Sequence, residues 1–224
     1  SLGAPPATST QFVLDLAAGI AEEAALVGAS VVGGDITSSD SIIIAISVLG
    51  TCDQAPVRRA GAQPGDVLAL AGRQGWAAAG LAVLSRGFNS PRVLVEAYQA
   101  PEVPYAAGPA AALAGATAML DVSDGLVADA RHLALASDVD IDIRASNFEV
   151  AEPMQAVGAA IGCDPMDFIL NGGDDYCLLA TFPAAVELPD GFQAIGVVGS
   201  VSGEQPTVTV NGQAHEGSGG HRHF

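Results

Sequence analysis

Residues 41–50 read SIIIAISVLG, and this segment limits most strongly how the chain can fold. Successive side chains of a strand point to opposite sides, so a strand made of these residues is apolar on both faces. Such a strand lies inside a sheet that is covered on both sides. The preceding sequence predicts only one helix, ending at Gly28, and a short strand at 30–32. We therefore expect residues 1–51 to be the C-terminal remnant of a larger N-terminal domain.

From residue 52 onward, strand-like and helix-like patterns alternate. Residues 63–66 read QPGD, with proline second and glycine third, which is typical of a type II turn leading into a strand at 67–71. Further strands are predicted at 118–122, 140–143, 176–181, 194–198 and 207–210, and helices at 76–85, 91–99, 109–113, 126–136, 154–161 and 166–170. This alternation predicts an α/β to α+β fold with a mixed sheet and packed helices, in a C-terminal domain at 52–224.

The charge balance narrows the range of partners. Lys+Arg number 8 against Asp+Glu 25, which gives a formal net charge of -17, and every basic residue is an arginine. Such a chain repels nucleic acid, so a polyanionic substrate would have to arrive with metal cations. The longest apolar run, 42–49, is far shorter than the about 20 residues that span a membrane. We expect no membrane segment and no signal peptide, and the three scattered cysteines indicate reduced thiols and a cytoplasmic location.

Three loops combine glycines with aspartates: 33–35 (GGD), 121–125 (DVSDG) and 172–175 (GGDD). Glycine lets a backbone approach a ligand closely, and carboxylate oxygens are ligands that magnesium prefers. Strand alternation places Asp121 and Ser123 on one face. A single loop of this kind is more often an ordinary turn, but neighbouring carboxylates repel each other unless a cation lies between them. Together the three loops predict a metal site.

Other catalytic patterns are missing from the sequence. The lysine-containing phosphate loop, GxGxxG and GxSxG are all absent, so nucleophilic catalysis is disfavoured and no side-chain nucleophile is expected. Gly72–Gly75, before a helix, is better explained as a plain turn than as a phosphate cradle. Arg58 and Arg59 could pair with a phosphate or could be solvated surface residues. Direct in-line phosphoryl transfer, which depends on positioning and cations, suits these residues.

At these loops the sequence resembles thiamine-monophosphate kinase, of the AIR-synthetase-like (PurM-like) superfamily. The shared landmarks are, in order, VVGGDITSS, RRAGAQPGD, GxxGxxAAGL at 72–81, MLDVSDGLVAD, NGGDDYCLL and the terminal HF. The resemblance implies a PurM-like two-domain fold with an incomplete first domain. It also implies transfer of the γ-phosphoryl group of ATP to thiamine phosphate, giving thiamine diphosphate. Several Mg²⁺ ions and a homodimer formed through the N-terminal domain belong to the same expectation.

The resemblance assigns roles by position. The expected magnesium ligands are Asp35, Asp121 and Asp124. The expected ATP contacts are Gly34, Asp35, Arg59 and Ser123. The expected thiamine phosphate contacts are Asp174 and His221. Asp174 replaces the usual glutamate of the family, and His221 replaces the usual aromatic residue.

Two alternatives remain open at the level of sequence. The chain could be another ATP-using PurM-like enzyme, such as a selenophosphate or aminoimidazole-ribotide synthetase, although it shows no N-terminal reactive cysteine segment. It could also be a degenerate nucleotide- or metal-binding module without turnover. A chain without the family's front segment is expected to be inactive on its own.

Overall fold

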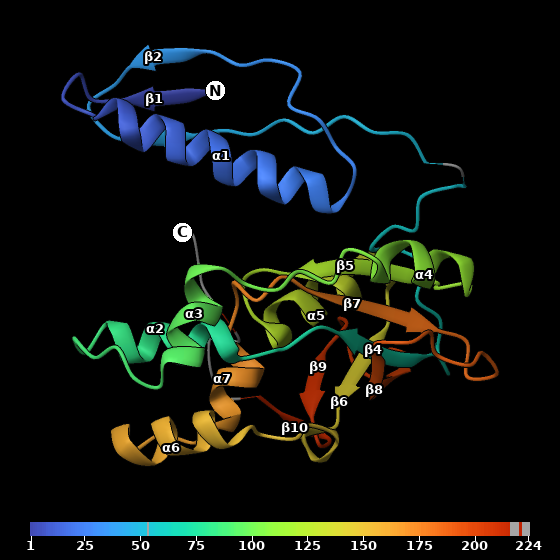
Figure 1. Cartoon of the computed structure of the whole chain (residues 1–224). Helices are drawn as coiled ribbons and strands as arrows, with labels where there is room; N and C mark the ends of the chain where they lie inside the picture. The colour runs from blue at the N-terminus through green and yellow to red at the C-terminus, as the bar shows by residue number, and fades with distance from the viewer. Residues whose placement is uncertain (53, 216–219, 221–224) are drawn as a thin grey trace. The chain divides into compact units, whose positions relative to one another are not determined.

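The computed structural model describes residues 1–52, 54–215 and 220. The chain divides into two compact units, Ser1–Ala55 and Pro56–Phe224 (Figure 1). Among the described helices, none is both long and apolar enough to cross a membrane.

The helix of the first unit, α1 (Thr10–Leu26), begins and ends at residues that explain its bounds. The Ser9 hydroxyl accepts a hydrogen bond from the backbone N–H of Phe12, which satisfies a donor that the first turn leaves open. Gly28, with a φ of 67°, follows the last turn, where a left-handed residue commonly ends a helix.

The sheet of the first unit is short. In it β1 (Leu2–Ala4) pairs in parallel with β2 (Ile36–Ser38) and antiparallel with β3 (Ile43–Ile44). The prediction of a strand at 30–32 is wrong, because these residues form no strand. The prediction of a long buried strand at 41–50 is also wrong, because only β3 forms there and its residues are exposed. The reason is that β1 has only three residues, so it can pair with only a short stretch of each neighbour.

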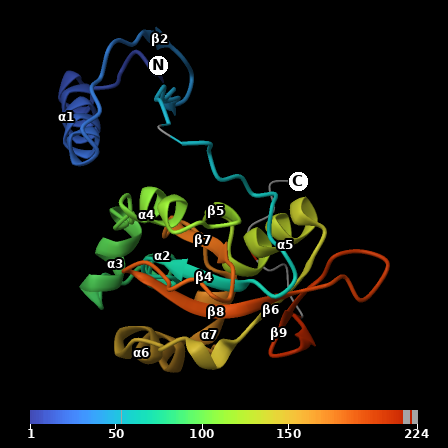
Figure 2. The same ribbon diagram turned by 90° about the vertical axis from the view of Figure 1, so that its right-hand side faces the viewer.

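The second unit contains a seven-stranded mixed sheet. Its strands are β4 (Val67–Ala71), β5 (Ala118–Val122), β6 (Asp140–Ile143), β7 (Cys177–Phe182), β8 (Phe192–Gly199), β9 (Val208–Val210) and β10 (Gln213–Ala214). Their order is β10-β9-β6-β8-β4-β7-β5, which Figure 2 shows from β5 at one edge toward β9 near the other. The β6–β9 pair is parallel and the other pairs are antiparallel.

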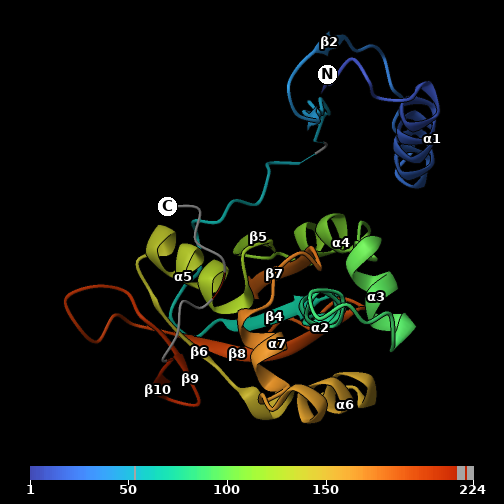
Figure 3. The same ribbon diagram turned by 90° about the vertical axis from the view of Figure 1, so that its left-hand side faces the viewer.

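Helices cover both faces of this sheet. They are α2 (Trp76–Leu84), α3 (Arg92–Gln99), α4 (Ala107–Leu113), α5 (Leu126–Ser137), α6 (Glu152–Ile161) and α7 (Met166–Asn171), with a short 3₁₀ turn at Ala145–Asn147. The buried side of α5 packs against Leu68 and Leu70, whereas Ala111 of α4 packs against Ala69 on the opposite face. α2, α3, α6 and α7 share a separate apolar cluster, and they lie together in Figures 1 and 3. The predicted strands and helices of this unit are confirmed to within a few residues.

The turn before β4 has the predicted type II geometry. The N–H of Asp66 donates to the carbonyl of Gln63 (3.0 Å), and Gly65 has a φ of 96°. The Asp66 carboxylate is buried and accepts hydrogen bonds from the N–H of Gln63 (2.9 Å) and the hydroxyl of Thr117 (2.6 Å). Asp66 therefore fixes one end of β4.

Candidate functional site

The second and third acidic loops lie against each other in the second unit. The N–H of Asp174 donates to the carbonyl of Ser123 (3.1 Å). A Cβ atom at Gly173 would lie 1.9 Å from that same oxygen, so only glycine allows this approach. The structure thus brings Asp121, Ser123 and Asp124 together with Asp174, in segments about 50 residues apart in sequence.

One hollow between these loops, which we call the acidic hollow, has a volume of about 540 Å³. It lies between the start of α2, the DVSDG loop and the GGDD loop. Its lining residues are Ala77, Ala78, Leu81, Ser123, Asp124, Asn171, Gly172, Gly173 and Asp174. Two carboxylates therefore border a cavity large enough for a small phosphate-bearing ligand.

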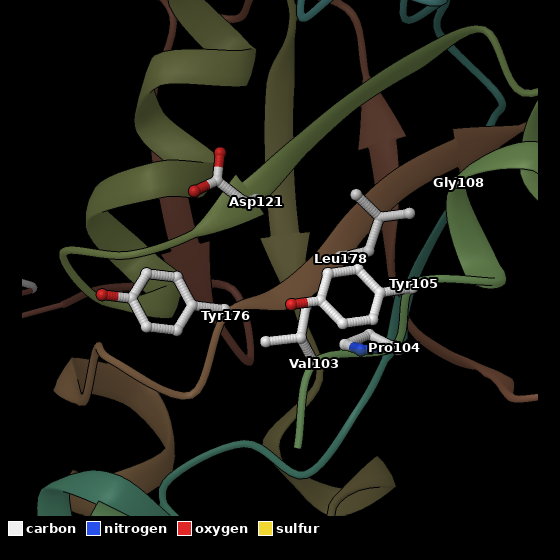
Figure 4. Close-up of a pocket in the computed structure, with 7 residues that line it drawn as sticks. All are labelled: Val103, Pro104, Tyr105, Gly108, Asp121, Tyr176 and Leu178. Atoms are coloured by element: carbon white, nitrogen blue, oxygen red, sulfur yellow. The ribbon is translucent and has the colours of Figure 1, made fainter. Parts of the chain in front are cut away.

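A second hollow, which we call the apolar hollow, has a volume of about 490 Å³. Its lining residues are Val103, Pro104, Tyr105, Gly108, Asp121, Tyr176 and Leu178. Figure 4 shows Asp121 on β5 and Tyr176 at the start of the segment that becomes β7. In the same view, the ring of Tyr105 lies between the side chains of Leu178 and Val103. The apolar and aromatic lining suits a planar organic group, with a carboxylate at the edge.

The GGDD loop has an unusual backbone. Asp174 has a φ of 64° and Tyr176 a φ of 52°, values that L-residues with side chains rarely adopt. Such conformations cost on the order of 1–3 kcal/mol each and persist where the surroundings hold them in place. They occur where Asp174 lines one hollow and Tyr176 lines the other.

The local field is negative. Burial raises the pKa of the Tyr176 hydroxyl, and the negative charges of Asp174 and Asp121 raise it further. Side-chain atoms of Asp124, Asp129 and His132 also lie within 4.8 Å of one another, so these residues could hold a metal ion. The carboxylate oxygens in this negatively charged region are suitable ligands for Mg²⁺, which binds oxygen atoms of carboxylates together with those of phosphates.

Asp129 orders the DVSDG loop. Its Oδ2 accepts hydrogen bonds from the N–H groups of Ser123 (3.0 Å), Asp124 (3.0 Å) and Gly125 (3.2 Å). Burial raises the pKa of this carboxyl group, although these bonds oppose the rise. The sequence does not indicate this role, because the only signal is an aspartate in the first turn of the following helix.

Gly72–Gly75 forms a strand-to-helix turn, as the sequence favoured. The carboxylate of Asp175 accepts hydrogen bonds from the N–H groups of Gly75 (2.6 Å) and Ala77 (2.8 Å) at the start of α2. These donors, which a phosphate cradle would need, are therefore engaged by the protein itself. Burial raises the pKa of Asp175 to about 6, although the backbone hydrogen bonds and the charge of Arg73 stabilise the ionised form.

The remaining predicted residues lie elsewhere in the chain. Gly34 and Asp35 belong to the first unit, on the exposed segment before β2, so their roles remain predictions. Arg59 is exposed, and its carbonyl accepts a bond from the Ser137 hydroxyl (3.1 Å) at the end of α5. In the described part of the chain Arg59 lines neither hollow, and its ATP contact remains a prediction. His221 lies outside the described residues.

His215 is another residue near the site that the sequence did not single out. His215 Nε2 lies 2.7 Å from Oδ1 of Asn171, which lines the acidic hollow. Forty-four residues separate the two, and nothing in the local pattern of either indicates the contact.

Comparison with known proteins identifies the class of this fold and site. The family described as AIR synthase related protein, C-terminal domain, matches residues 63–210, which include both hollows. The second unit is therefore a domain of this class.

The relatives specify the family further. A thiamine-monophosphate kinase from Corynebacterium glutamicum is 38% identical over 231 residues, covering 100% of this chain and 69% of the relative. One from Mycobacterium tuberculosis (strain ATCC 25618 / H37Rv) is 39% identical over 224 residues, covering 99% of this chain. The chain spans 66% of the length of that relative. The chain belongs to the thiamine-monophosphate kinase family.

The solved structures agree with this assignment. AaThiL complexed with AMPPCP and TMP has a TM-score of 0.84 at 28% sequence identity, covering 100% of this chain and 72% of that chain. The expected PurM-like mixed α/β fold is thereby confirmed.

Proposed function

We propose that the protein transfers the γ-phosphoryl group of ATP to thiamine phosphate with the help of magnesium ions, giving thiamine diphosphate. The observation that carries the proposal is the contact between the DVSDG and GGDD loops, which places Asp124 and Asp174 at one hollow and Asp121 at another. The relative solved with AMPPCP and TMP supports both substrates. Phosphoryl transfer needs positioning and cations, and this site supplies carboxylates for cations without a lysine.

The residues would divide the work as follows. Asp121 and Asp124 would hold Mg²⁺, which neutralises phosphate charge when bound, and Asp35 is also proposed as a magnesium ligand. Gly34, Arg59 and Ser123 would contact ATP, and Asp174 and His221 would contact thiamine phosphate. No side chain acts as a nucleophile, because the acceptor phosphate attacks directly. The protein's part is to orient the two phosphates and exclude water.

We also propose a cytoplasmic homodimer formed through the N-terminal domain. The free cysteines Cys52, Cys163 and Cys177 are compatible with a reducing compartment. Sedimentation of the full-length protein tests the dimer, and a monomeric mass at micromolar concentration would contradict it.

A coupled assay of ADP release from the full-length gene product, with thiamine phosphate as acceptor, tests the activity. We expect turnover that requires Mg²⁺ and that falls by about 100-fold or more in Asp121→Asn, because one metal ligand loses its charge. Calorimetry with a non-hydrolysable ATP analogue separates the alternatives. Magnesium-dependent binding without turnover indicates a degenerate binding module, and no turnover with thiamine phosphate would sink the kinase proposal.

A further inference from the structure

Asp175 joins two parts of the acidic hollow that are distant in sequence. Gly75, which precedes α2, carries no side chain that could cap the helix. The carboxylate of Asp175 takes that place, accepting from the N–H groups of Gly75 (2.6 Å) and Ala77 (2.8 Å). A carboxylate at a helix N-terminus satisfies open donors and interacts favourably with the helix dipole. The GGDD loop therefore supplies the cap of the helix that forms the opposite wall of the hollow.

Gln74 reinforces the same junction from the other side. Its Nε2 donates to the carbonyls of Ile169 (3.1 Å) and Gly172 (2.6 Å), so the turn before α2 bonds directly to the start of the GGDD loop. Both Gln74 and Asp175 are buried, at 6% and 4% exposure. Buried hydrogen bonds of this kind are costly to break, because the freed groups cannot reach water.

The backbone at this junction allows little adjustment. A Cβ at Gly75 would lie 2.9 Å from the backbone nitrogen of Ile169, and one at Gly172 would lie 2.7 Å from the Cβ of Ala78. On the other side, the N–H of Asp174 bonds to Ser123. Asp174 is thus held between the start of α2 and the DVSDG loop, in a left-handed conformation that its neighbours must maintain.

We infer that Asp175 is a positioning residue, whose carboxylate fixes the GGDD loop against α2 and so sets the placement of Asp174 opposite Asp124 across the acidic hollow. The inference rests on the proposed function for its kinetic consequence. Asp175 itself is turned toward α2 and would not touch the substrate. A displacement of about 1 Å in such a site can lower the rate by about 100-fold.

The test compares Asp175→Asn with Asp66→Asn in the full-length protein. Asp66 is a matched control, because it is also a buried aspartate that accepts two hydrogen bonds and lies at the other end of β4. Both variants are expected to lower the melting temperature. Only Asp175→Asn is expected to raise KM for thiamine phosphate and to lower kcat/KM by about 10- to 100-fold beyond the control.

A second readout does not depend on activity. Trp76, the single tryptophan of the sequence, is the first residue of α2. Asp175→Asn is expected to shift its fluorescence emission and to weaken magnesium-dependent binding of a non-hydrolysable ATP analogue, whereas Asp66→Asn leaves both unchanged. If Asp175→Asn does not fold, Gln74→Met, which removes the two bonds to Ile169 and Gly172, should give the same pattern.

The outcomes separate this inference from the proposed function. A wild-type protein without turnover overturns the kinase proposal, while the fluorescence and binding comparison still tests the junction. The other outcome is that the wild-type protein turns over, but Asp175→Asn and Asp66→Asn have the same kinetics, nucleotide binding and fluorescence emission. This result overturns the positioning role of Asp175 and leaves the kinase proposal intact.

Discussion

The acidic hollow and the apolar hollow are built from the same two loops, yet their linings differ. The DVSDG loop gives Asp124 to the acidic hollow and Asp121 to the apolar one. The GGDD loop and the residue after it give Asp174 to the first and Tyr176 to the second. The other walls differ: backbone and small residues near α2 line one hollow, and the Val103–Pro104–Tyr105 segment lines the other. Two short segments thus contribute to the lining of two hollows of different polarity.

The physical cause is the change of direction at each loop. Asp121 lies within β5, paired with Leu178 of β7, so its side chain follows the alternation of the sheet. Asp124 lies beyond the end of β5, in the loop whose backbone N–H groups donate hydrogen bonds to the carboxylate of Asp129. In the GGDD loop and just after it, the chain changes direction at Asp174 and Tyr176, which both have left-handed backbone conformations.

The largest expected effect on turnover comes from a substitution in the acidic hollow. Asp124→Asn should lower magnesium-dependent turnover by about 100-fold or more, because the proposed metal ligand loses its charge. The measurement is the rate of ADP release over a magnesium titration. His132→Ala is the matched control, since His132 belongs to the same cluster but offers a ring nitrogen. Full activity in Asp124→Asn would show that the acidic hollow does not hold the ion, and an equal loss in His132→Ala would indicate a nitrogen-bound metal.

An intermediate effect on the kinetics is expected from a substitution in the apolar hollow. Tyr105→Ala should raise KM for thiamine phosphate by about 10-fold with little change in kcat, because an organic group bound in the apolar hollow would lose an aromatic contact, which contributes to binding rather than to chemistry. Steady-state kinetics with varied thiamine phosphate measure this. Leu81→Ala, which removes an apolar side chain from the acidic hollow, is the control. Equal changes in KM for the two variants would mean that the apolar hollow does not bind the organic part of thiamine phosphate.

The smallest effect on the site is expected from a carboxylate remote from both hollows. Asp140 accepts hydrogen bonds from the N–H and hydroxyl groups of Ser202 and Thr207, and these bonds, led by that of the Ser202 hydroxyl, lower its pKa to about 2. Asp140→Asn should leave kcat and KM unchanged and lower the free energy of unfolding by about 1 kcal/mol at pH 7.

The pH dependence of that difference follows from the lowered pKa. The folded carboxyl group holds its charge below the ordinary value of 3.8, so its stabilising contribution is present above pH 4 and fades as the pH falls toward 2. Urea unfolding at pH 7, 4 and 2.5 measures it. If the difference in the free energy of unfolding between the wild type and Asp140→Asn stays constant over this pH range, the stabilisation does not come from the charged carboxylate.

Much of the second unit could be predicted from the sequence. The strand at 118–122, the helix that follows it and the turn at 63–66 were predicted from local patterns that the tertiary structure leaves intact. The segment at 41–50 could not be predicted in this way. Its apolar composition indicates a buried strand, but strand formation also requires a partner of matching length, and β1 is only three residues long.

By itself, the sequence determined the chemistry available to this protein: acidic glycine loops, no lysine, and a net charge of -17 that requires cations for any phosphate. Only the tertiary structure decided how the adjacent aspartates of NGGDDY divide their roles. Asp174 borders the acidic hollow, whereas Asp175 is buried and caps α2, which begins 99 residues earlier. Local spacing cannot distinguish the two, because their difference arises from which of them meets open N–H groups of a distant helix.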